Sequence, residues 1–260
     1  MLNDSAVIAS CEELERRLGY KLEPGETWEA PKDQEMDHFG INPQKQSGLN
    51  YVGVSCLGGR IQSVKLRKLC ELAETYGGAR LRNTNKQNIL ILDVPTANLE
   101  ALKKDLDAAG FVYQASNFRK GGVSCTGIEF CNLAVAETKN RLMILVEQLE
   151  EMGSYDGKIR IHFSGCPSSC GQHQIADIGF RGSKVKIDGQ QVDAFEMFVG
   201  GRLGEGRRFN ELVKSKVPSK DLHLVVKKLL DFYQANKNGH ESFGDFCSRV
   251  PREQISAALN

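Results

Sequence analysis

The sequence predicts an α+β fold in which a small unit is followed by a larger one. Two observations carry this prediction: apolar residues switch repeatedly between the alternation typical of strands and the spacing typical of helices, and glycines close most of these segments. The chain has 260 residues, of which 40% are hydrophobic and 26% charged. It is therefore long enough to bury a sizeable core without disulfides.

The first half of the chain alternates between strands and helices after a polar start. In chain order we expect a helix at 11–18, an extended polar arm at 24–48, a strand at 51–54, a helix at 62–76, a strand at 88–93 and a helix at 96–109. Leu69, Leu72 and Ala73 form the apolar face of the helix at 62–76. Thr96 is expected to cap the helix that it begins, because its hydroxyl can accept a hydrogen bond from the first turn.

The second half begins with a long helix and continues mainly as strands. In chain order we expect a helix at 133–151, strands at 158–164, 175–180, 184–187 and 192–199, and a helix at 221–236. Apolar and polar residues alternate at 158–164, which predicts a half-buried strand. Asp188-Gly189 predicts a hairpin turn between the strands on either side of it.

Charge and composition exclude several kinds of partner. Thirty-four Lys and Arg against 33 Asp and Glu leave a formal charge of +1, which gives no long-range field to attract nucleic acid or acidic membranes. Residues 1–10 lack the features of a signal peptide, and no apolar run is long enough to span a membrane. We therefore expect a cytoplasmic protein that binds neither nucleic acid nor membranes, and in that reducing compartment paired cysteines more often hold metal than form disulfides.

Four of the eight cysteines stand in two close pairs. The pairs are Cys125-x5-Cys131 and Cys166-x3-Cys170, and both are expected in loops, one before the long helix and one after the strand at 158–164. Four thiolates brought together in this way suit an iron–sulfur cluster, which takes four cysteine ligands. Small residues around them, including Gly127, Gly165 and Gly171, leave room for a bulky cofactor.

Two other interpretations of these cysteines stay open on spacing alone. Structural zinc also uses four cysteines, but its usual spacing of two to four residues does not fit the first pair. Cys166, Cys170 and His173 can supply three zinc ligands, which leaves the first pair unexplained. The second alternative is that the cysteines are unrelated buried thiols.

Several longer motifs follow one another along the chain. They are Asn50–Val54, Arg82–Asn88, Ser124–Cys131, Glu137–Arg141, Ser164–Gln172, Ala176–Gly179 and Gly200–Gly204. In sequence and in order they resemble motifs of the ferredoxin-type nitrite/sulfite reductases, and the likeness covers roughly residues 40–235. The resemblance implies four parts: an N-terminal helix and arm at 1–36, a ferredoxin-like half-domain at 37–118, a sirohaem- and [4Fe-4S]-binding α+β domain with a mixed sheet at 119–240, and a C-terminal tail at 241–260.

The same resemblance implies cofactors and a reaction. It implies a [4Fe-4S] cluster held by Cys125, Cys131, Cys166 and Cys170, with Cys170, the last of the four, bridging to sirohaem. The reaction is the six-electron reduction of nitrite to ammonia or of sulfite to sulfide, with a slight lean to nitrite and an electron donor such as ferredoxin. The expected sirohaem-binding residues, besides Cys170, are Arg119, Lys120, Thr126 and Arg202. Arginine suits the many carboxylates of that cofactor.

An anionic substrate requires cations near the haem. We expect an anion pocket made of Arg82, Lys86, Lys158 and Arg160, from motifs that resemble the substrate-binding segments of the family. These residues can act within one chain or across a two-fold interface in a homodimer. Lysine ammonium groups can also donate the protons that oxygen removal requires.

The length of the chain favours a second hypothesis. Familiar members of the family have about twice this length and contain two copies of the unit, and this chain resembles the second, cluster-bearing copy or a short single-unit member. A family arginine of the small domain is also missing, because Gly53 and Ser55 stand in its place. The alternative is therefore an electron-transfer or assembly subunit that works with a complementary half-subunit and has no catalytic haem site of its own.

Overall fold

The computed structural model describes residues 4–23, 38–153, 155, 157–204 and 206–260, which fall into two units, Met1–Lys32 and Asp33–Asn260. The first unit holds helix α1 (Asp4–Leu18), so the predicted helix at 11–18 is confirmed and begins earlier.

Of the predicted arm, 24–37 lies outside the described residues. The prediction is wrong at 40–43, which form strand β1 (Gly40–Pro43) because they pair with the neighbouring strand. Gly53 permits this pairing, since a Cβ there would lie 1.9 Å from the carbonyl oxygen of His38.

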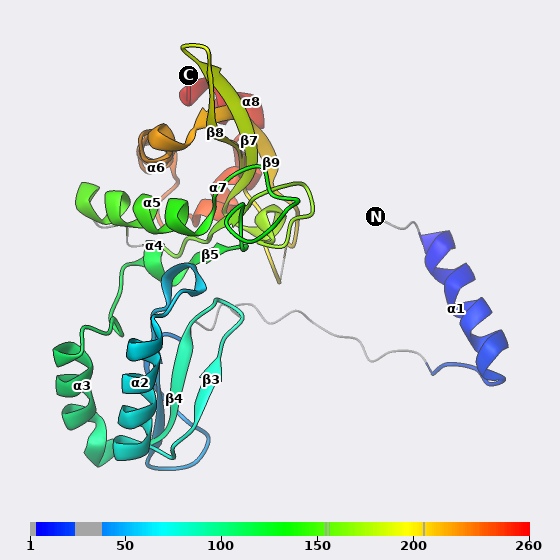
Figure 1. Ribbon diagram of the computed structural model, residues 1–260. Coiled ribbons are helices and arrows are strands. Elements are labelled where there is room, and N and C mark those ends of the chain that lie inside the picture. Colours follow the sequence, from blue (N-terminus) through cyan, green and yellow to red (C-terminus); the bar gives the residue numbers. More distant parts are fainter. Residues whose placement is uncertain (1–3, 24–37, 154, 156, 205) are drawn as a thin grey trace. The chain divides into compact units, whose positions relative to one another are not determined.

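The small domain at the start of the second unit is an antiparallel sheet with two helices. Strands β1, β2 (Leu49–Val54), β4 (Ile89–Pro95) and β3 (Leu81–Asn83) lie in the order β1-β2-β4-β3. Helices α2 (Ser63–Tyr76) and α3 (Leu99–Ala108) pack on the sheet, and their leucines share one core with Val52 and Ile91 (Figure 1). The strands expected at 51–54 and 88–93 and the helix at 62–76 are confirmed. The third helix is confirmed with a later start.

Two details of the small domain differ from expectation. Thr96 does not cap α3: it lies in a short 3-10 helix, η2 (Thr96–Asn98), and its hydroxyl donates to the carbonyl oxygen of Gly48 at 3.2 Å. Strand β3 has no apolar alternation, because Arg82 and Asn83 are exposed, and backbone pairing with β4 alone defines it.

The larger domain is built on a mixed five-stranded sheet, as the resemblance implies. Its strands are β5 (Gly122–Ser124), β6 (Ile161–Ser164), β7 (Ile178–Ile187), β8 (Gln190–Val199) and β9 (Glu211–Pro218), in that order across the sheet. The first two pairings are parallel and the last two antiparallel. Asp188 and Gly189 form the expected turn between β7 and β8, both with positive φ.

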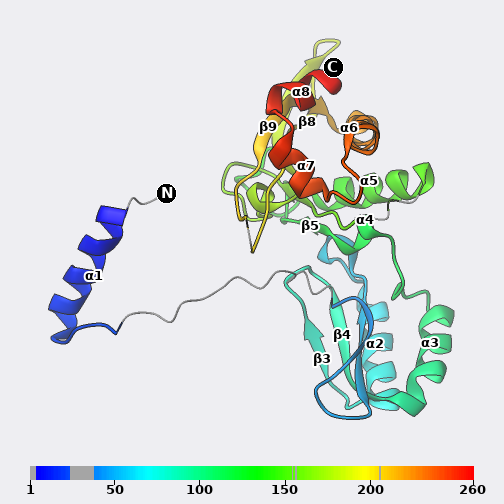
Figure 2. The same ribbon diagram turned by 180° about the vertical axis from the view of Figure 1, so that it is seen from behind.

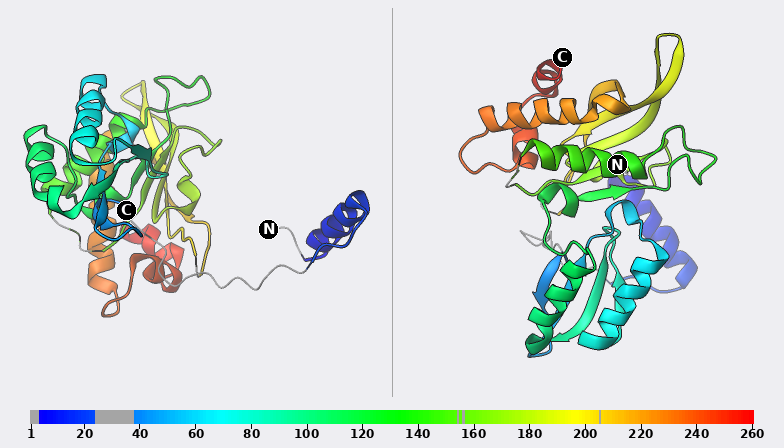
Figure 3. Two further views of the ribbon diagram at one scale, coloured as in Figure 1. Left: turned by 90° about the horizontal axis from the view of Figure 1, so that it is seen from below. Right: turned by 60° about the vertical axis from the view of Figure 1, so that its left-hand side comes forward.

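Helices complete this domain. They are α4 (Asn117–Lys120), α5 (Lys139–Met152), α6 (Leu222–Asn236), α7 (Phe243–Arg249) and α8 (Arg252–Ala258). Helices α5 and α6 lie side by side and share one core with the sheet (Figure 3). The 3-10 helix η1 (Leu57–Gly59) belongs to the small domain in sequence, but its Leu57 enters the core of the larger one. The two domains are therefore joined by packing as well as by the chain.

Three predictions for the larger domain are corrected. The long helix begins at Lys139 rather than at Leu133, because the Glu137 carboxylate accepts from the amides of Asn140 and Arg141 and so starts the helix there. The strand expected at 158–164 forms at Ile161–Ser164 as β6, and because all four of its residues are buried, both of its faces are covered rather than one. The strands expected at 175–180 and 184–187 form the single strand β7, after a 3-10 helix η3 (His173–Ile175).

The segment 241–260 is not a tail. It forms α7 and α8, whose Phe243, Phe246 and Ile255 lie in the core of the larger domain, and α8 packs against β9 and α6 (Figure 2). The Ser242 hydroxyl accepts from the amide of Asp245 and so caps α7. In the part of the chain that the structure describes, no helix has the length and apolar composition needed to cross a membrane.

Candidate iron–sulfur and haem site

The two cysteine loops start at the ends of neighbouring parallel strands. Strand β5 leads directly into Cys125, and β6 leads through Gly165 into Cys166. The Cys125 amide donates to the carbonyl oxygen of Phe163 at 3.0 Å, and the Gly165 amide donates to Cys125 Sγ at 3.1 Å. Because the carboxyl ends of parallel strands meet at one edge of the sheet, the two pairs are brought to the same place.

Two glycines allow the loops to pack closely. A Cβ at Gly127, which has a φ of +71°, would lie 2.6 Å from Thr138 Oγ1, and one at Gly165 would lie 3.0 Å from the Ala134 side chain. Thr138 Oγ1 donates to the Cys125 carbonyl oxygen at 2.7 Å. The segment from Cys125 to Thr138 is therefore folded back on itself and held against the second loop.

The second loop passes over β6 in a conformation that requires a third glycine. A Cβ at Gly171 would lie 2.0 Å from the carbonyl oxygen of Phe163. Ser169 and Gln172 both have positive φ, and the Gln172 amide donates to the Ser169 carbonyl oxygen at 2.7 Å. This turn buries Cys166 and leaves Cys170 exposed. An exposed last cysteine is accessible to a second cofactor.

The surroundings of the cysteines fit an iron–sulfur cluster. The Gly165 N–H bond to Cys125 Sγ is of the kind that tunes and stabilises cluster sulfurs. The buried hydroxyls of Ser124 and Ser164, beside the two loops, make no hydrogen bond within the described residues. Within the same residues no group of three His, Cys, Asp or Glu side chains has the arrangement of a single-ion metal site.

Of the four residues expected in the anion pocket, Lys86 and Arg160 share a neighbour in the structure, which is His162. Arg82 and Lys158 are exposed, and Lys86 is half-buried in the turn before β4. Arg160 is buried and forms an ion pair with Asp177, with Nε 2.9 Å from Oδ2. Burial lowers the pKa of His162 to about 4, with contributions from the charges of Arg160 and Lys86. These two cations therefore both act on His162, from different domains.

His162 connects this cluster of cations to the second cysteine loop. Its Nδ1–H donates to the carbonyl oxygen of Gln172 at 3.2 Å, which leaves Nε2 unprotonated in the neutral ring. His173 is also buried, and burial, with the nearby charge of Arg181, lowers its pKa to about 4. Both histidines are therefore neutral at physiological pH.

The two buried histidines predict a loss of stability in mild acid. Their folded pKa values, about 4, lie below the ordinary 6.5, so the unfolded chain binds protons first. We expect full stability above about pH 6.5 and a fall towards pH 4 of up to ~1.4 kcal/mol per pH unit for each histidine. Urea unfolding at pH 7 and pH 5 measures this difference. His162→Gln should reduce it, whereas the same change at the exposed His240 should not; equal pH dependence in both variants would contradict the prediction.

The expected sirohaem residues lie on separate elements, and three of them have partners already. Arg119 on α4 pairs with Glu150, with Nη2 2.6 Å from Oε2, and Arg202 pairs with Asp245 of α7. Lys120 lies over the ring of Phe39, 5.9 Å from its centre. Thr126 is exposed directly after Cys125. Their role toward the haem stays a prediction.

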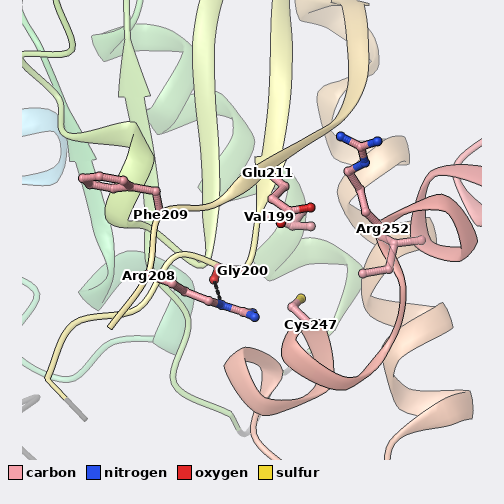
Figure 4. Close-up of a pocket in the computed structure, with 8 residues that line it drawn as sticks. Val199, Gly200, Arg208, Phe209, Glu211, Cys247 and Arg252 are labelled. Carbon is pink, nitrogen blue, oxygen red and sulfur yellow. Dashed lines mark hydrogen bonds between the residues drawn. The ribbon is translucent and has the colours of Figure 1, made fainter. Parts of the chain in front are cut away.

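A small pocket lies beside Gly200, the first residue of the Gly-rich motif. Figure 4 shows the Arg208 side chain beneath Gly200, and its Nε donates to the Gly200 carbonyl oxygen at 2.6 Å. Cys247 lines the same pocket, and burial raises its pKa to about 12. Burial likewise raises the pKa of Cys56 to about 11. Both groups stay protonated thiols at neutral pH, which does not suit cluster ligands.

Sequence patterns did not identify three residues that hold the site together. Arg60 forms an ion pair with Glu129 in the first cysteine loop, and Asp177 neutralises Arg160. Gln87 Nε2 donates to the carbonyl oxygen of Ser124 at 2.7 Å, and the Ser124 amide donates to Gln87 Oε1 at 3.1 Å. Their contacts cross between segments far apart in the chain, so periodicity cannot show them. Gln87 and Asp177 do lie inside two of the motifs noted above.

Comparison with known protein families agrees with this geometry. Residues 42–109 match the nitrite/sulfite reductase ferredoxin-like half domain, and residues 122–260, more than half of the chain, match the nitrite and sulphite reductase 4Fe-4S domain. The chain belongs to the nitrite and sulfite reductase family. Members of this family are oxidoreductases, and membership implies a [4Fe-4S] cluster coupled to sirohaem.

Individual members of the nitrite and sulfite reductase family show how much of their length this chain represents. It is 40% identical over 197 residues to a ferredoxin–nitrite reductase of Synechococcus elongatus, a match that covers 76% of this chain and 38% of the relative. It is 37% identical over 233 residues to sulfite reductase [ferredoxin] 1 of Mycolicibacterium paratuberculosis, covering 87% and 42%. The solved NirA protein of Mycobacterium tuberculosis superposes with a TM-score of 0.87 at 33% identity, covering 97% of this chain and 47% of that one. The chain thus spans less than half the length of these relatives.

Proposed function

We propose that this chain holds the cluster and the sirohaem of a ferredoxin-dependent reductase that converts nitrite to ammonia or sulfite to sulfide. The single observation that carries the proposal is the junction of the two cysteine loops at the ends of β5 and β6, closed by the Gly165 hydrogen bond to Cys125 Sγ. The names of the relatives support ferredoxin as donor and nitrite or sulfite as substrate. We propose nitrite rather than sulfite as the substrate, because the motifs at 168–172 and 176–179 resemble those of the nitrite reductases slightly more.

In this proposal Cys125, Cys131, Cys166 and Cys170 hold the cluster, and the exposed Cys170 meets the haem. When bound, the cluster and sirohaem would supply the electrons for the reduction of the small anion. Lys86, from the turn before β4, attracts that anion with Arg82 and Lys158 and can donate a proton. Arg160 adds less positive charge to this pocket, since Asp177 balances its guanidinium. None of the eight cysteines, all of which the structure describes, forms a disulfide.

We also propose that this chain contacts a second polypeptide, either a second copy or a complementary half-subunit. The first cysteine loop exposes large apolar side chains beside Cys131, with Phe130 75% and Leu133 71% exposed. Exposed apolar groups of this size commonly mark contact surfaces. The alternative, an electron-transfer subunit without its own haem, is favoured by the pairing of Arg160 with Asp177, which removes one cation from the pocket.

The deciding experiment is an assay of the purified chain with iron and sirohaem measured in the same sample. Nitrite and sulfite are offered separately with a reduced viologen as electron source, and light scattering gives the mass of the active species. Turnover of either anion by the homogeneous chain supports the reductase. A preparation with a full cluster, no sirohaem bands and no turnover would support the electron-transfer alternative instead.

Lys86→Met is expected to lower turnover about 100-fold, the usual effect of losing a proton donor, while iron and sirohaem content stay unchanged. The matched control is Lys45→Met, which removes an exposed lysine of the same domain and should leave turnover unaltered. Steady-state rates and cofactor absorbance are measured together. If loss of cofactor accounts for the whole decrease, Lys86 does not belong to the anion pocket.

A further inference from the structure

The two hydrogen bonds of Gln87 satisfy the free edge of the strand that leads to Cys125. Among the strands that the structure describes, β5 is an edge strand that pairs with β6 alone. The Cys125 amide faces β6, where it donates to Phe163, so the N–H and C=O of the preceding Ser124 face the opposite edge. The Gln87 side-chain amide meets both groups, at 3.1 and 2.7 Å. It therefore acts as one residue of a neighbouring strand.

The turn that presents Gln87 is closed by its own hydrogen bonds. The Gln87 amide donates to the Thr84 carbonyl oxygen at 3.1 Å, and the Thr84 amide donates to the Asn88 carbonyl oxygen at 2.9 Å. Gln87 has a φ of 63°, in the left-handed region that residues other than glycine seldom adopt. Such backbone strain persists only where the surroundings hold it, and it concentrates at functional sites.

The aliphatic part of the Gln87 side chain also packs against η1. A Cβ at Gly59 would lie 3.3 Å from both Cβ and Cδ of Gln87, so the glycine leaves just enough room for the side chain. The adjacent Gly58 carbonyl accepts from Lys139 Nζ, at the start of α5. The small domain thus contacts the chain on both sides of the first cysteine loop, at Ser124 before it and at Lys139 after it.

We propose that Gln87 is a positioning residue for Cys125, and that it makes the small domain a structural support of the cluster. Gln87 follows Lys86, so one short turn carries both the proposed substrate cation and the anchor of a cluster ligand. Displacing either end of this turn moves the other. The inference rests on the proposed cluster ligands but requires neither sirohaem nor substrate, which allows it to be tested on the cluster alone.

The test measures the cluster rather than catalysis. In Gln87→Met both hydrogen bonds to Ser124 are lost at nearly constant volume, and we expect iron to leave the protein about ten times faster in the presence of a chelator, with an altered electron paramagnetic resonance spectrum of the reduced cluster. Gln87→Glu keeps an acceptor for the Ser124 amide but sets a carboxylate against the Ser124 carbonyl. Its rate of iron loss is expected to lie between those of the parent and the methionine variant.

The matched control is Gln44→Met. Gln44 is half-buried in the same domain, and its side-chain amide also bonds twice to one residue, donating to Asp93 Oδ1 at 3.0 Å and accepting from the Asp93 amide at 2.7 Å. It makes a third, exposed hydrogen bond to Gln46 Oε1 at 3.2 Å. We expect similar thermal destabilisation in both methionine variants but altered iron loss and spectrum only at Gln87. Equal iron retention in Gln87→Met and the parent, or equal loss in the two methionine variants, would overturn the positioning role alone. A parent that binds no iron would overturn the cluster ligands as well.

Discussion

Cys170→Ser is expected to abolish reduction of nitrite and sulfite, with a fall in viologen-linked turnover of more than about 100-fold. Loss of a group that only supports a metal ligand costs about 10–100-fold in affinity or activity, and here a ligand itself is removed. A serine hydroxyl has a far higher pKa than a thiol, so it does not supply the thiolate that iron binds. The sirohaem bands should also shift, because the proposed bridge between haem and cluster is broken.

The control for this change is Cys70→Ser. Cys70 is an exposed thiol on α2, away from both cysteine loops, so its replacement tests whether an exposed thiol as such matters. Iron content, the absorbance bands of sirohaem and turnover are measured on both proteins. If Cys170→Ser keeps a parental spectrum and parental turnover, Cys170 is not the bridge, and one of the other cysteines must take that position.

The place of the two cysteine pairs in loops was predictable from sequence, because cysteine spacing, neighbouring glycines and strand ends are all local features. The strands at 51–54 and 88–93 and the helix at 62–76 were predictable for the same reason, since their apolar period follows their burial. Where a side chain overrides the period, prediction failed. The Glu137 carboxylate fixes the start of α5 at Lys139, six residues after Leu133. Leu133 itself is exposed, although its apolar character suggested that it belonged to the helix.

The anion pocket was less predictable because it depends on contacts between distant segments. Alternation at 158–164 placed Arg160 on an exposed face, but Arg160 is buried directly before β6, and all four residues of that strand are buried as well. A buried arginine needs a carboxylate, and Asp177 supplies it from the segment before β7. Gln87 was missed for a related reason, since its partner Ser124 lies in another domain.

Removing the carboxylate of Asp177 is expected to destabilise the protein strongly. This side chain accepts from the Arg160 amide at 2.8 Å and from Arg160 Nε at 2.9 Å, and the guanidinium also donates to the Gly201 carbonyl oxygen at 3.0 Å. In Asp177→Ala the buried guanidinium loses its counter-charge, which costs about 3–5 kcal/mol of unfolding free energy. Urea unfolding measures this loss, and Asp231→Ala, in the exposed pair with Lys227, should change stability by less than about 1 kcal/mol.

The same ion pair separates a structural role of Arg160 from direct contact with substrate. If Arg160 mainly neutralises Asp177, Arg160→Met should destabilise the protein strongly, because it leaves a buried carboxylate unpaired, and the double change Arg160→Met with Asp177→Leu should recover most of the lost stability. If Arg160 instead binds the substrate anion, the double variant should be stable but as inactive as the single one. Unfolding curves and turnover of Asp177→Ala, Arg160→Met and the double variant therefore decide whether the anion pocket contains four cations or three. A stable, fully active double variant would remove Arg160 from the pocket.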